Sequence, residues 1–294
     1  MLLESQDYQG WNSPWEPNAT SVGRGPCAWT VLIPFFNERN FLDGTLASLA
    51  AQDVPFELIL IDNGSTDGSG DVAAAICQRL GLSYTLRVDR RPGKVNALQS
   101  GIECTKTPFV ATCDADTLYP TDYLRNAQHL LETSGAVAGG AYFVTPTATA
   151  EDHAQAAQRM ARAAKLLPAQ CHTGGAGQVF RTDALRRAGQ FDASRWGYVL
   201  EDHEIMHRMA KLGRLAYGGA LWCAPSPRER DRESIRWTLL ERVLYHVTPK
   251  PARDWFFYDF LSRRLAARKL TSDRIRERQF YAQTDFANRS ATPA

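Results

Sequence analysis

Apolar and polar residues alternate in blocks along residues 29–116, where short apolar runs are separated by segments of helical periodicity. The runs "WTVLIPFF", "FELILI", "SYTLRV" and "PFVATC" predict strands, and the intervening residues 41–51, 71–81 and 94–105 predict helices. Gly81 closes the second helical segment, a position where glycine commonly ends a helix. This alternation predicts an α/β fold with a mostly parallel sheet and helices on both of its faces.

The pattern is less regular after residue 135. "GAVAGGAYFV" predicts a strand, "EDHAQAAQRMARAAKLLPA" a helix, and "CHTGGAGQVFRTDALRRAGQFD" a glycine-containing loop followed by a strand and a short helix. "LEDHEIMHRMAKLG" predicts a helix that begins acidic and ends basic, as the helix dipole favours. We expect an irregular extension over 1–27, one α/β domain over 28–245, and a helical, basic and aromatic extension over 246–294.

Composition indicates an ordinary globular protein. The chain of 294 residues is 44% hydrophobic, and 34 Lys and Arg against 32 Asp and Glu leave a net charge of +2, which gives no reason to expect a nucleic-acid partner. The six cysteines include no C-x-x-C pair, and "MLLESQDYQG" lacks the basic and apolar regions of a secretory signal. We expect a cytoplasmic protein.

Unusual polar residues follow each of the first four predicted strands. "PFFNE" ends the first, "DNGSTDGS" the second, "RRPGK" the third and "DADT" the fourth. In open parallel sheets, ligands bind at the carboxyl ends of the strands. The four segments therefore predict one site.

Two of these segments carry acidic residues. Asp114 and Asp116 are two positions apart, so extended backbone places both on one face, a spacing that suits Mg²⁺ or Mn²⁺ shared with a diphosphate. The alternative is a turn or helix cap. Asp62 could accept hydrogen bonds from a base or sugar, whereas Ser65 and Thr66 could cap the next helix instead.

Charged residues also mark two predicted helix starts. Arg91 and Lys94 flank a Pro-Gly turn where they could meet phosphate, or could form a solvated basic turn. Glu201 and Asp202 begin a later helix, either as caps or with one of them acting as a general base.

Two histidines follow on that helix. His203 and His207, four residues apart, could share a helix face as metal ligands, but no third ligand stands in the usual spacing.

Taken in order, several segments resemble the family-2 glycosyltransferases, which are inverting enzymes of the GT-A fold. The resemblance spans roughly residues 29–240 and rests on "TVLIPFFNE", "LILIDNGSTDGS", "RPGKVNALQSG", "VATCDADT", "TGGAGQVFRTDALRRAGQFD" and "LEDHEIMHRMAKLGR". "ESIRW" is similar to the family's Q-x-x-R-W signature, with Arg236 and Trp237 matching and Glu233 in place of Gln. That departure weakens the acceptor-side assignment.

The resemblance implies a metal-dependent transfer of a sugar from a nucleoside-diphosphate-sugar, with UDP or GDP favoured, to a hydroxyl of a glycan, a lipid-linked or a small-molecule acceptor. It implies that the nucleotide is bordered by Pro34, Phe35, Asn37, Glu38, Asp62, Arg91, Gly93, Lys94 and Asp114. Asp114 and Asp116 would hold Mn²⁺ or Mg²⁺, and Asp202 would be the catalytic base. The donor sugar and acceptor would lie near Gly174, Gly175, Glu201, Arg236 and Trp237.

The C-terminal extension combines basic and aromatic residues. Residues 250–280 are basic, and Phe256, Phe257, Phe260, Leu261 and Leu265 follow helical spacing, a pattern that suits a peripheral contact with the anionic inner face of a membrane. The alternative is that these aromatics pack on the main domain or across a homodimer interface.

The sequence leaves two other functions open. A sugar-1-phosphate nucleotidylyltransferase would be expected to open with a Gly-rich phosphate loop, where this chain has "PFFNERN". A noncatalytic nucleotide-sugar or glycan-binding relative is opposed by Asp114, Asp116 and Asp202, which match the family's motifs.

Overall fold

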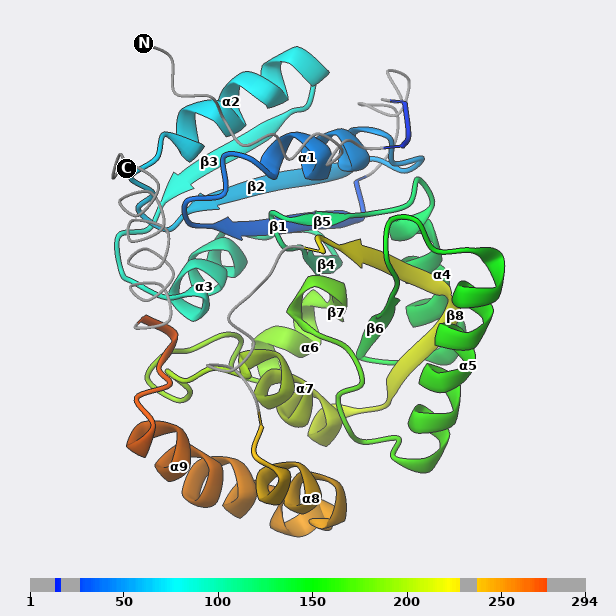
Figure 1. Cartoon of the computed structure of the whole chain (residues 1–294), viewed down its shortest axis with the longest axis vertical. Coiled ribbons are helices and arrows are strands. Elements are labelled where there is room, and N and C mark those ends of the chain that lie inside the picture. Colours follow the sequence, from blue (N-terminus) through cyan, green and yellow to red (C-terminus); the bar gives the residue numbers. More distant parts are fainter. Residues whose placement is uncertain (1–13, 17–26, 228–236, 274–294) are drawn as a thin grey trace, which may run out of the picture.

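The computed structural model describes residues 14–16, 27–227 and 237–273. Its centre is an eight-stranded sheet with the order β3-β2-β1-β4-β7-β6-β8-β5 (Figure 1). The strands are β1 (Trp29–Phe35), β2 (Phe56–Asp62), β3 (Tyr84–Val88), β4 (Phe109–Thr112), β5 (Thr117–Leu118), β6 (Ala138–Phe143), β7 (Gln178–Arg181) and β8 (Leu215–Pro225).

The helices connect these strands and extend past the last one. The α-helices are α1 (Leu42–Ala50), α2 (Ser69–Leu80), α3 (Lys94–Cys104), α4 (Tyr123–Ser134), α5 (Ala150–Leu166), α6 (Thr182–Arg187), α7 (Glu201–Leu212), α8 (Leu239–Val247) and α9 (Ser262–Ala267). Short 3-10 turns lie at η1 (Gly175–Gly177) and η2 (Lys250–Ala252), and a π-helix lies at η3 (Trp255–Leu261).

The predicted α/β fold is confirmed, with a sheet that is parallel in its first half and mixed in its second. β1 to β4 pair parallel to one another, as the strand–helix alternation predicts. β7 runs antiparallel to β4 and β6, whereas β6 and β8 are again parallel. The carboxyl ends of β1 to β4 therefore meet at one edge.

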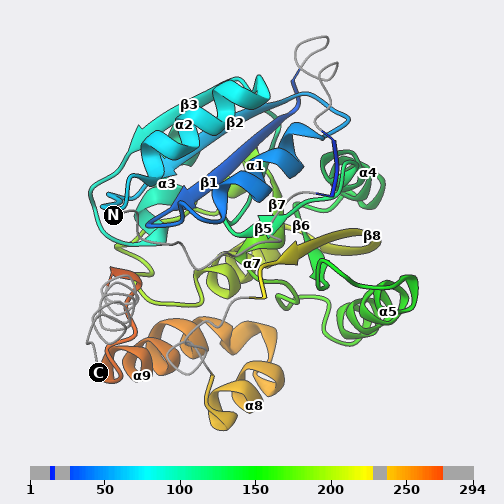
Figure 2. The ribbon, with the colours of Figure 1, turned by 45° about the horizontal axis from the view of Figure 1, so that its top comes forward.

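Side chains that alternate along β1 divide the core into two layers. Val31 and Ile33 belong to the cluster that α1, α2 and α4 cover, whereas Leu32 belongs to the cluster covered by α3, α6 and α7. This is the period-two pattern of a strand buried on both faces. Figure 2 shows α1 and α2 together over the first strands, and α7 on the other side of the sheet.

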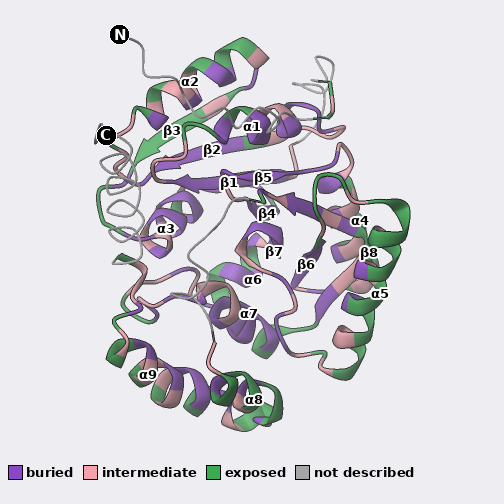
Figure 3. Ribbon diagram, viewed as in Figure 1, coloured by how far each residue is buried: buried purple, intermediate pink, exposed green. Residues whose placement is uncertain are grey.

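The C-terminal extension packs on the main domain. Phe256 and Phe257 are buried in one cluster with Trp196 and Leu200, the residue that precedes α7. Thus the packing alternative holds for these aromatics. In Figure 3 the exposed surface of this region lies on the outer sides of α8 and α9. Within the ranges that the structure describes, no helix is both long and apolar enough to cross a bilayer.

Candidate active site

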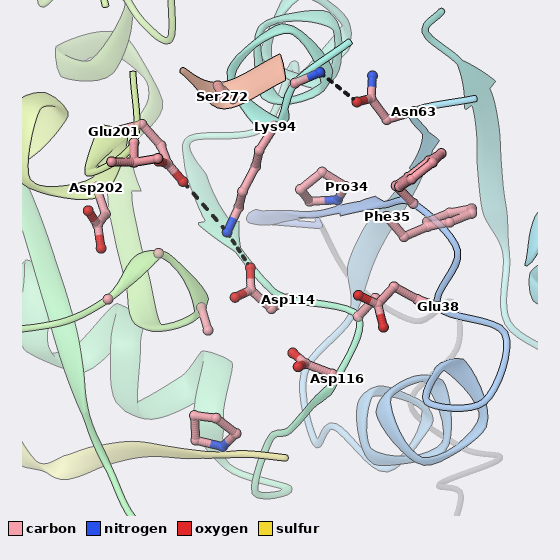
Figure 4. A pocket seen from close by; sticks show the side chains of 18 of the residues that line it. Pro34, Phe35, Glu38, Asn63, Lys94, Asp114, Asp116, Glu201, Asp202 and Ser272 are labelled. Atoms are coloured by element: carbon pink, nitrogen blue, oxygen red, sulfur yellow. Dashed lines mark hydrogen bonds and ion pairs between the residues drawn. The ribbon is translucent and has the colours of Figure 1, made fainter. Parts of the chain in front are cut away.

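The strand ends open into one cavity of about 350 Å³ (Figure 4). The end of β1 and the segments that follow β2, β3 and β4 contribute to it, and so does the start of α7. The predicted site residues that line it are Pro34, Phe35, Glu38, Gly93, Lys94, Asp114, Asp116, Gly174, Gly175, Glu201 and Asp202. The structure therefore brings together segments that are separated by more than a hundred residues in the sequence.

Some predicted residues are not part of this lining. They are Asn37, Asp62, Arg91 and Trp237. Arg236 lies outside the described residues, and so do residues 274–280 of the predicted membrane segment.

Asp62 and Asn37 organise loops at the first two strand ends. Asp62 Oδ1 accepts a hydrogen bond from the backbone N–H of Ser65 at 2.7 Å. A Cβ atom on Gly70 would lie 2.8 Å from Asp62 Oδ2, so glycine leaves room for this carboxylate. Asn37, at φ +56°, accepts from the N–H of Thr66 and thereby ties the β1 loop to the β2 loop.

Asn63 is the residue at the end of β2 that lines the cavity, and no role was predicted for it from the sequence. Its amide nitrogen donates to the carbonyls of Asp89 and Arg91, and its oxygen accepts from the N–H of Gly93. Gly93 has φ +111°, a conformation that other residues rarely adopt. Asn63 therefore fixes the turn that places Lys94 at the start of α3.

Lys94 lies between two groups of carboxylates. Its Nζ is 2.5 Å from Asp114 Oδ1 and 3.9 Å from Glu201 Oε1. Burial acts to lower the pKa of Lys94, but the charges of Asp114 and Glu201 outweigh it and hold this pKa above its ordinary value. The ammonium group stays charged at neutral pH.

The lining carries a strong excess of negative charge. Among the described lining residues, the acidic ones are Glu38, Asp114, Asp116, Glu201 and Asp202, and Lys94 is the one Lys or Arg. A diphosphate would be repelled by this cavity on its own, whereas a divalent cation would be attracted.

The two aspartates after β4 fit such a cation in part. The backbone N–H of Asp114 donates to the hydroxyl of Tyr119, and the carbonyl of Asp116 accepts from Ser226. Both carboxylates line the cavity, in which no third His, Cys, Asp or Glu of the described ranges completes a metal cluster with them. Mg²⁺ and Mn²⁺ sites of this kind take their remaining oxygens from water and from substrate phosphates.

The start of α7 positions the other pair of carboxylates. Leu200, at φ +65°, turns the chain into the helix, and Gln178 Nε2 donates to the backbone carbonyl of Asp202 at 2.8 Å. Burial, with the nearby charge of Asp202, raises the pKa of Glu201 to about 7, although Lys94 opposes the shift. The positive φ of Leu200 is a strained conformation for a residue other than glycine, and such conformations are often found at functional sites.

Asp202 and His203 form a hydrogen-bonded pair. Asp202 Oδ1 lies 2.8 Å from the backbone nitrogen of His203 and 2.9 Å from its Nδ1. Burial acts to raise the pKa of Asp202, but His203 and Lys94 hold it below its ordinary value. The carboxylate is therefore ionised near neutral pH, and Oδ1 is already engaged by His203.

A second cavity of about 320 Å³ adjoins the first. Phe143 and Gly174 line both cavities, and the second is also lined by His172 and His203. The Asp202–His203 pair thus connects them, because Asp202 lines one cavity and His203 the other.

The glycines of the loop before β7 leave room for side chains of the protein itself. A Cβ on Gly174 would lie 3.0 Å from the ring of Phe143, and a Cβ on Gly175 would lie 3.1 Å from Lys94 Nζ. Close approach by Phe143 and Lys94 is therefore a structural reason for these two glycines, beside the space for a sugar that the resemblance implies.

The two histidines of α7 do not face a common metal site. His203 bonds to Asp202, while His207 Nε2 lies 2.7 Å from Asp254 Oδ1 and its ring stacks on Phe257. Trp237, the predicted acceptor residue, packs against His203 with ring centroids 5.3 Å apart.

Comparison with known families decides the classification. The family model for glycosyl transferase family 2 matches residues 30–189, which is more than half of the chain. The chain belongs to glycosyl transferase family 2. The match begins in β1, includes Asp114 and Asp116, and ends before the helix that carries Asp202.

Relatives of known sequence are similar over part of their length. Validoxylamine A glucosyltransferase of Streptomyces hygroscopicus subsp. limoneus is 29% identical over 142 residues, which are 42% of this chain and 31% of that protein. The matched part covers between 24% and 35% of the length of this and two other curated relatives.

Solved structures share the GT-A fold. The mannosyltransferase PcManGT of Pyrobaculum calidifontis, solved with GDP-Man and Mn²⁺, is 21% identical with a TM-score of 0.62 over 98% of this chain and 80% of that one. TarS 1-349 of S. aureus, solved with UDP-GlcNAc, is 15% identical with a TM-score of 0.54 over 81% of this chain and 72% of that one.

Proposed function

We propose that this family-2 protein is a metal-dependent, inverting glycosyltransferase that moves a sugar from a nucleoside-diphosphate-sugar to an acceptor hydroxyl. The observation that carries the proposal is the acidic cavity at the strand ends, where Asp114 and Asp116 face Lys94 and the start of α7. A diphosphate enters such a cavity only with a cation that offsets the carboxylates.

Asp114 and Asp116 are the residues that would hold the divalent cation, Mn²⁺ or Mg²⁺. These ions are commonly bound by one or two carboxylates, and water and substrate phosphates fill the remaining coordination positions. The two aspartates therefore fit such an ion. When bound, the ion would supply positive charge that stabilises the departing diphosphate. Because the protein offers two carboxylates, we expect metal and nucleotide to bind together and each to strengthen the binding of the other.

Asp202 is proposed as the general base. Its Oδ1 is held by His203, which leaves Oδ2 to take the proton of the acceptor hydroxyl. The acceptor oxygen forms a bond to the anomeric carbon while the bond from that carbon to the diphosphate oxygen breaks. One such displacement inverts the anomeric configuration, and Lys94, near the predicted phosphate position, adds fixed positive charge.

The second cavity is proposed as the acceptor side, because it meets the donor cavity at Gly174 beside Asp202. Phe143, whose side chain is 40% exposed, offers an aromatic surface for a sugar ring. The relatives' names support a carbohydrate, lipid-linked or small-molecule acceptor and UDP or GDP as the donor nucleotide. The proposal also includes a cytoplasmic location and assigns the catalytic domain to residues 28–245.

The other functions that the sequence left open gain no support. Membership of glycosyl transferase family 2 argues against a nucleotidylyltransferase. The hydrogen-bonded Asp202–His203 pair, set at the junction of two cavities, argues against a noncatalytic binding protein.

The test is to incubate the protein with UDP- and GDP-sugars, Mn²⁺ and a panel of carbohydrate acceptors, and to measure release of the nucleoside diphosphate. We expect one donor to release its nucleotide faster when the right acceptor is present, and NMR of the product to show an inverted anomeric centre. Retention of configuration would contradict the mechanism, and a complete lack of release with every donor would contradict the function.

His203 is expected to act as a positioning residue for Asp202. In His203→Phe the hydrogen bond between the side chain and Asp202 Oδ1 is lost, while the one from the backbone N–H remains, so we expect kcat to fall by about tenfold or more while KM for the donor changes little. Because His203 lowers the pKa of Asp202, its loss should raise that pKa and move the acidic limb of the kcat–pH profile to higher pH.

His203→Asn is the matched control, since the amide nitrogen of Asn can replace Nδ1 as a donor. It should restore much of kcat and return the acidic limb towards that of the wild type. Equal losses in both variants, with an unmoved pH profile, would contradict the positioning role.

A further inference from the structure

The outer side of α8 carries a row of apolar side chains in solvent. Leu239 is 79% exposed, Leu240 52%, Val243 48% and Val247 65%. These are four of the ten large hydrophobic residues that are exposed in the described part of the chain. At 100° per residue they fall within an arc of roughly 100° on one side of the helix.

The opposite side of α8 is firmly attached to the protein. Glu241 is fully buried and bonds to Arg264 and Arg268 at 2.8 and 2.7 Å. The Tyr245 hydroxyl accepts from the N–H of Cys171 at 2.9 Å, and Thr238 caps the helix start. The apolar row is therefore a fixed surface, and a rotation of α8 that buried it would break these contacts.

The charges around this row are positive. Between residues 237 and 253, Arg242 and Lys250 are the exposed charged side chains, and the acidic Glu241 is buried. Farther along, the exposed charges offset one another, because Arg263 pairs with Asp259 and Asp254 pairs with Lys211. An anionic bilayer has an apolar interior and negatively charged headgroups at its interface with water. Apolar residues beside exposed cations complement both features.

We propose that this surface of α8, formed by Leu239, Leu240, Val243 and Val247 with Arg242 and Lys250, docks on an anionic phospholipid membrane. The residues differ from those that the sequence indicates for this role, because Phe256 and Phe257 are 0% exposed and pack inside the protein. Trp255, in the same region, is 50% exposed and packs against Phe260.

Docking through α8 would bring the second cavity near the membrane. Tyr245, on the inner side of α8, lies 5.5 Å from the ring of His203, which lines that cavity. Figures 1 and 2 both place α8 at the end of the molecule that is remote from α1 and α2. The docking itself does not depend on the proposed transfer activity, whereas the consequence, an acceptor attached to a lipid, rests on it.

The experiment is flotation of the full chain with vesicles of phosphatidylglycerol and phosphatidylcholine, compared with vesicles of phosphatidylcholine alone. We expect the wild type to float with the anionic vesicles and to be released by salt. The triple variant Leu240→Gln, Val243→Gln, Val247→Gln should bind about tenfold or more weakly, because three apolar contacts with the interface are removed. Arg242→Gln with Lys250→Gln should weaken binding by roughly fivefold for each charge.

Leu166→Gln is the matched control, because Leu166 is 78% exposed at the end of α5 and is not part of α8. It should float like the wild type, and unchanged melting temperatures would show that all variants are folded. Failure of the wild type to float, or equal flotation of the triple variant, would overturn the proposal. Concentration-dependent self-association that the triple variant abolishes would assign this surface to a second copy of the chain and overturn it as well.

Discussion

An Asp202→Asn variant is expected to bind the donor nucleotide almost normally and to transfer sugar about 10²–10⁴-fold more slowly than the wild type. Asn keeps the size of the side chain and can still accept from the backbone N–H of His203, so the start of α7 should stay in place. The amide cannot take a proton from the acceptor. Single-turnover transfer rates, together with nucleotide affinities from calorimetry, separate these two effects.

Glu201→Gln is the control for this experiment, because Glu201 is adjacent in sequence and lines the same cavity. Its pKa is raised to about 7, so the neutral glutamine resembles a form that the wild type already populates near neutral pH. We expect a clearly smaller loss than for Asp202→Asn. Near-normal transfer by Asp202→Asn would rule out this residue as the base, and a larger loss in Glu201→Gln would move that role to Glu201.

Replacement of Lys94 by Met is expected to produce the second large effect, a decrease of about 10²–10³-fold in kcat/KM. The variant removes the cation that contacts Asp114 and Glu201, which leaves the carboxylates of the cavity to repel one another and the diphosphate. The pKa of Glu201 should rise further, since Lys94 acts to lower it. Steady-state kinetics and nucleotide binding by calorimetry measure both parts of the effect.

Lys94→Arg tests whether charge alone is sufficient. The loop at Gly175 approaches Nζ so closely that a larger guanidinium group has little room, and we expect this variant to restore only part of kcat/KM. If Lys94→Met retained normal kcat/KM, Lys94 would have no part in donor binding or leaving-group stabilisation.

The first half of the fold could be predicted because its signals are local. Each apolar run from Trp29 to Thr112 is a parallel strand, buried in β1, β4 and most of β2 but largely exposed in the edge strand β3, and each intervening segment has helical periodicity. The convergence of the strand ends followed from the geometry of parallel sheets. β8 and α8 were not predicted, because Gly218 and Gly219 break the apolar pattern of the long strand in the sequence and the short helix depends on its packing against η3 and its ion pair to Arg264 of α9.

The cavity lining could be predicted only in part. Asp62 and Asn63 are adjacent at the end of β2, and nothing local shows that Asn63 faces the cavity while Asp62 holds its own loop. His203 could have been found from its position directly after Asp202, but from the sequence it was considered only as a metal ligand, for which no third residue stood in the usual spacing. Which of the C-terminal apolar residues are buried depends on Trp196 and Leu200, which lie more than fifty residues earlier in the chain.

The most direct test of the account is a thermal-shift panel of UDP, GDP, CDP and dTDP, each with and without Mn²⁺ or Mg²⁺. The account predicts that one nucleotide raises the melting temperature, that the increase requires the metal, and that Asp116→Ala abolishes it while the exposed-residue control Asp183→Ala retains it. A folded wild-type protein that is stabilised equally without metal, or by no nucleotide at all, would contradict a metal-dependent donor site at Asp114 and Asp116.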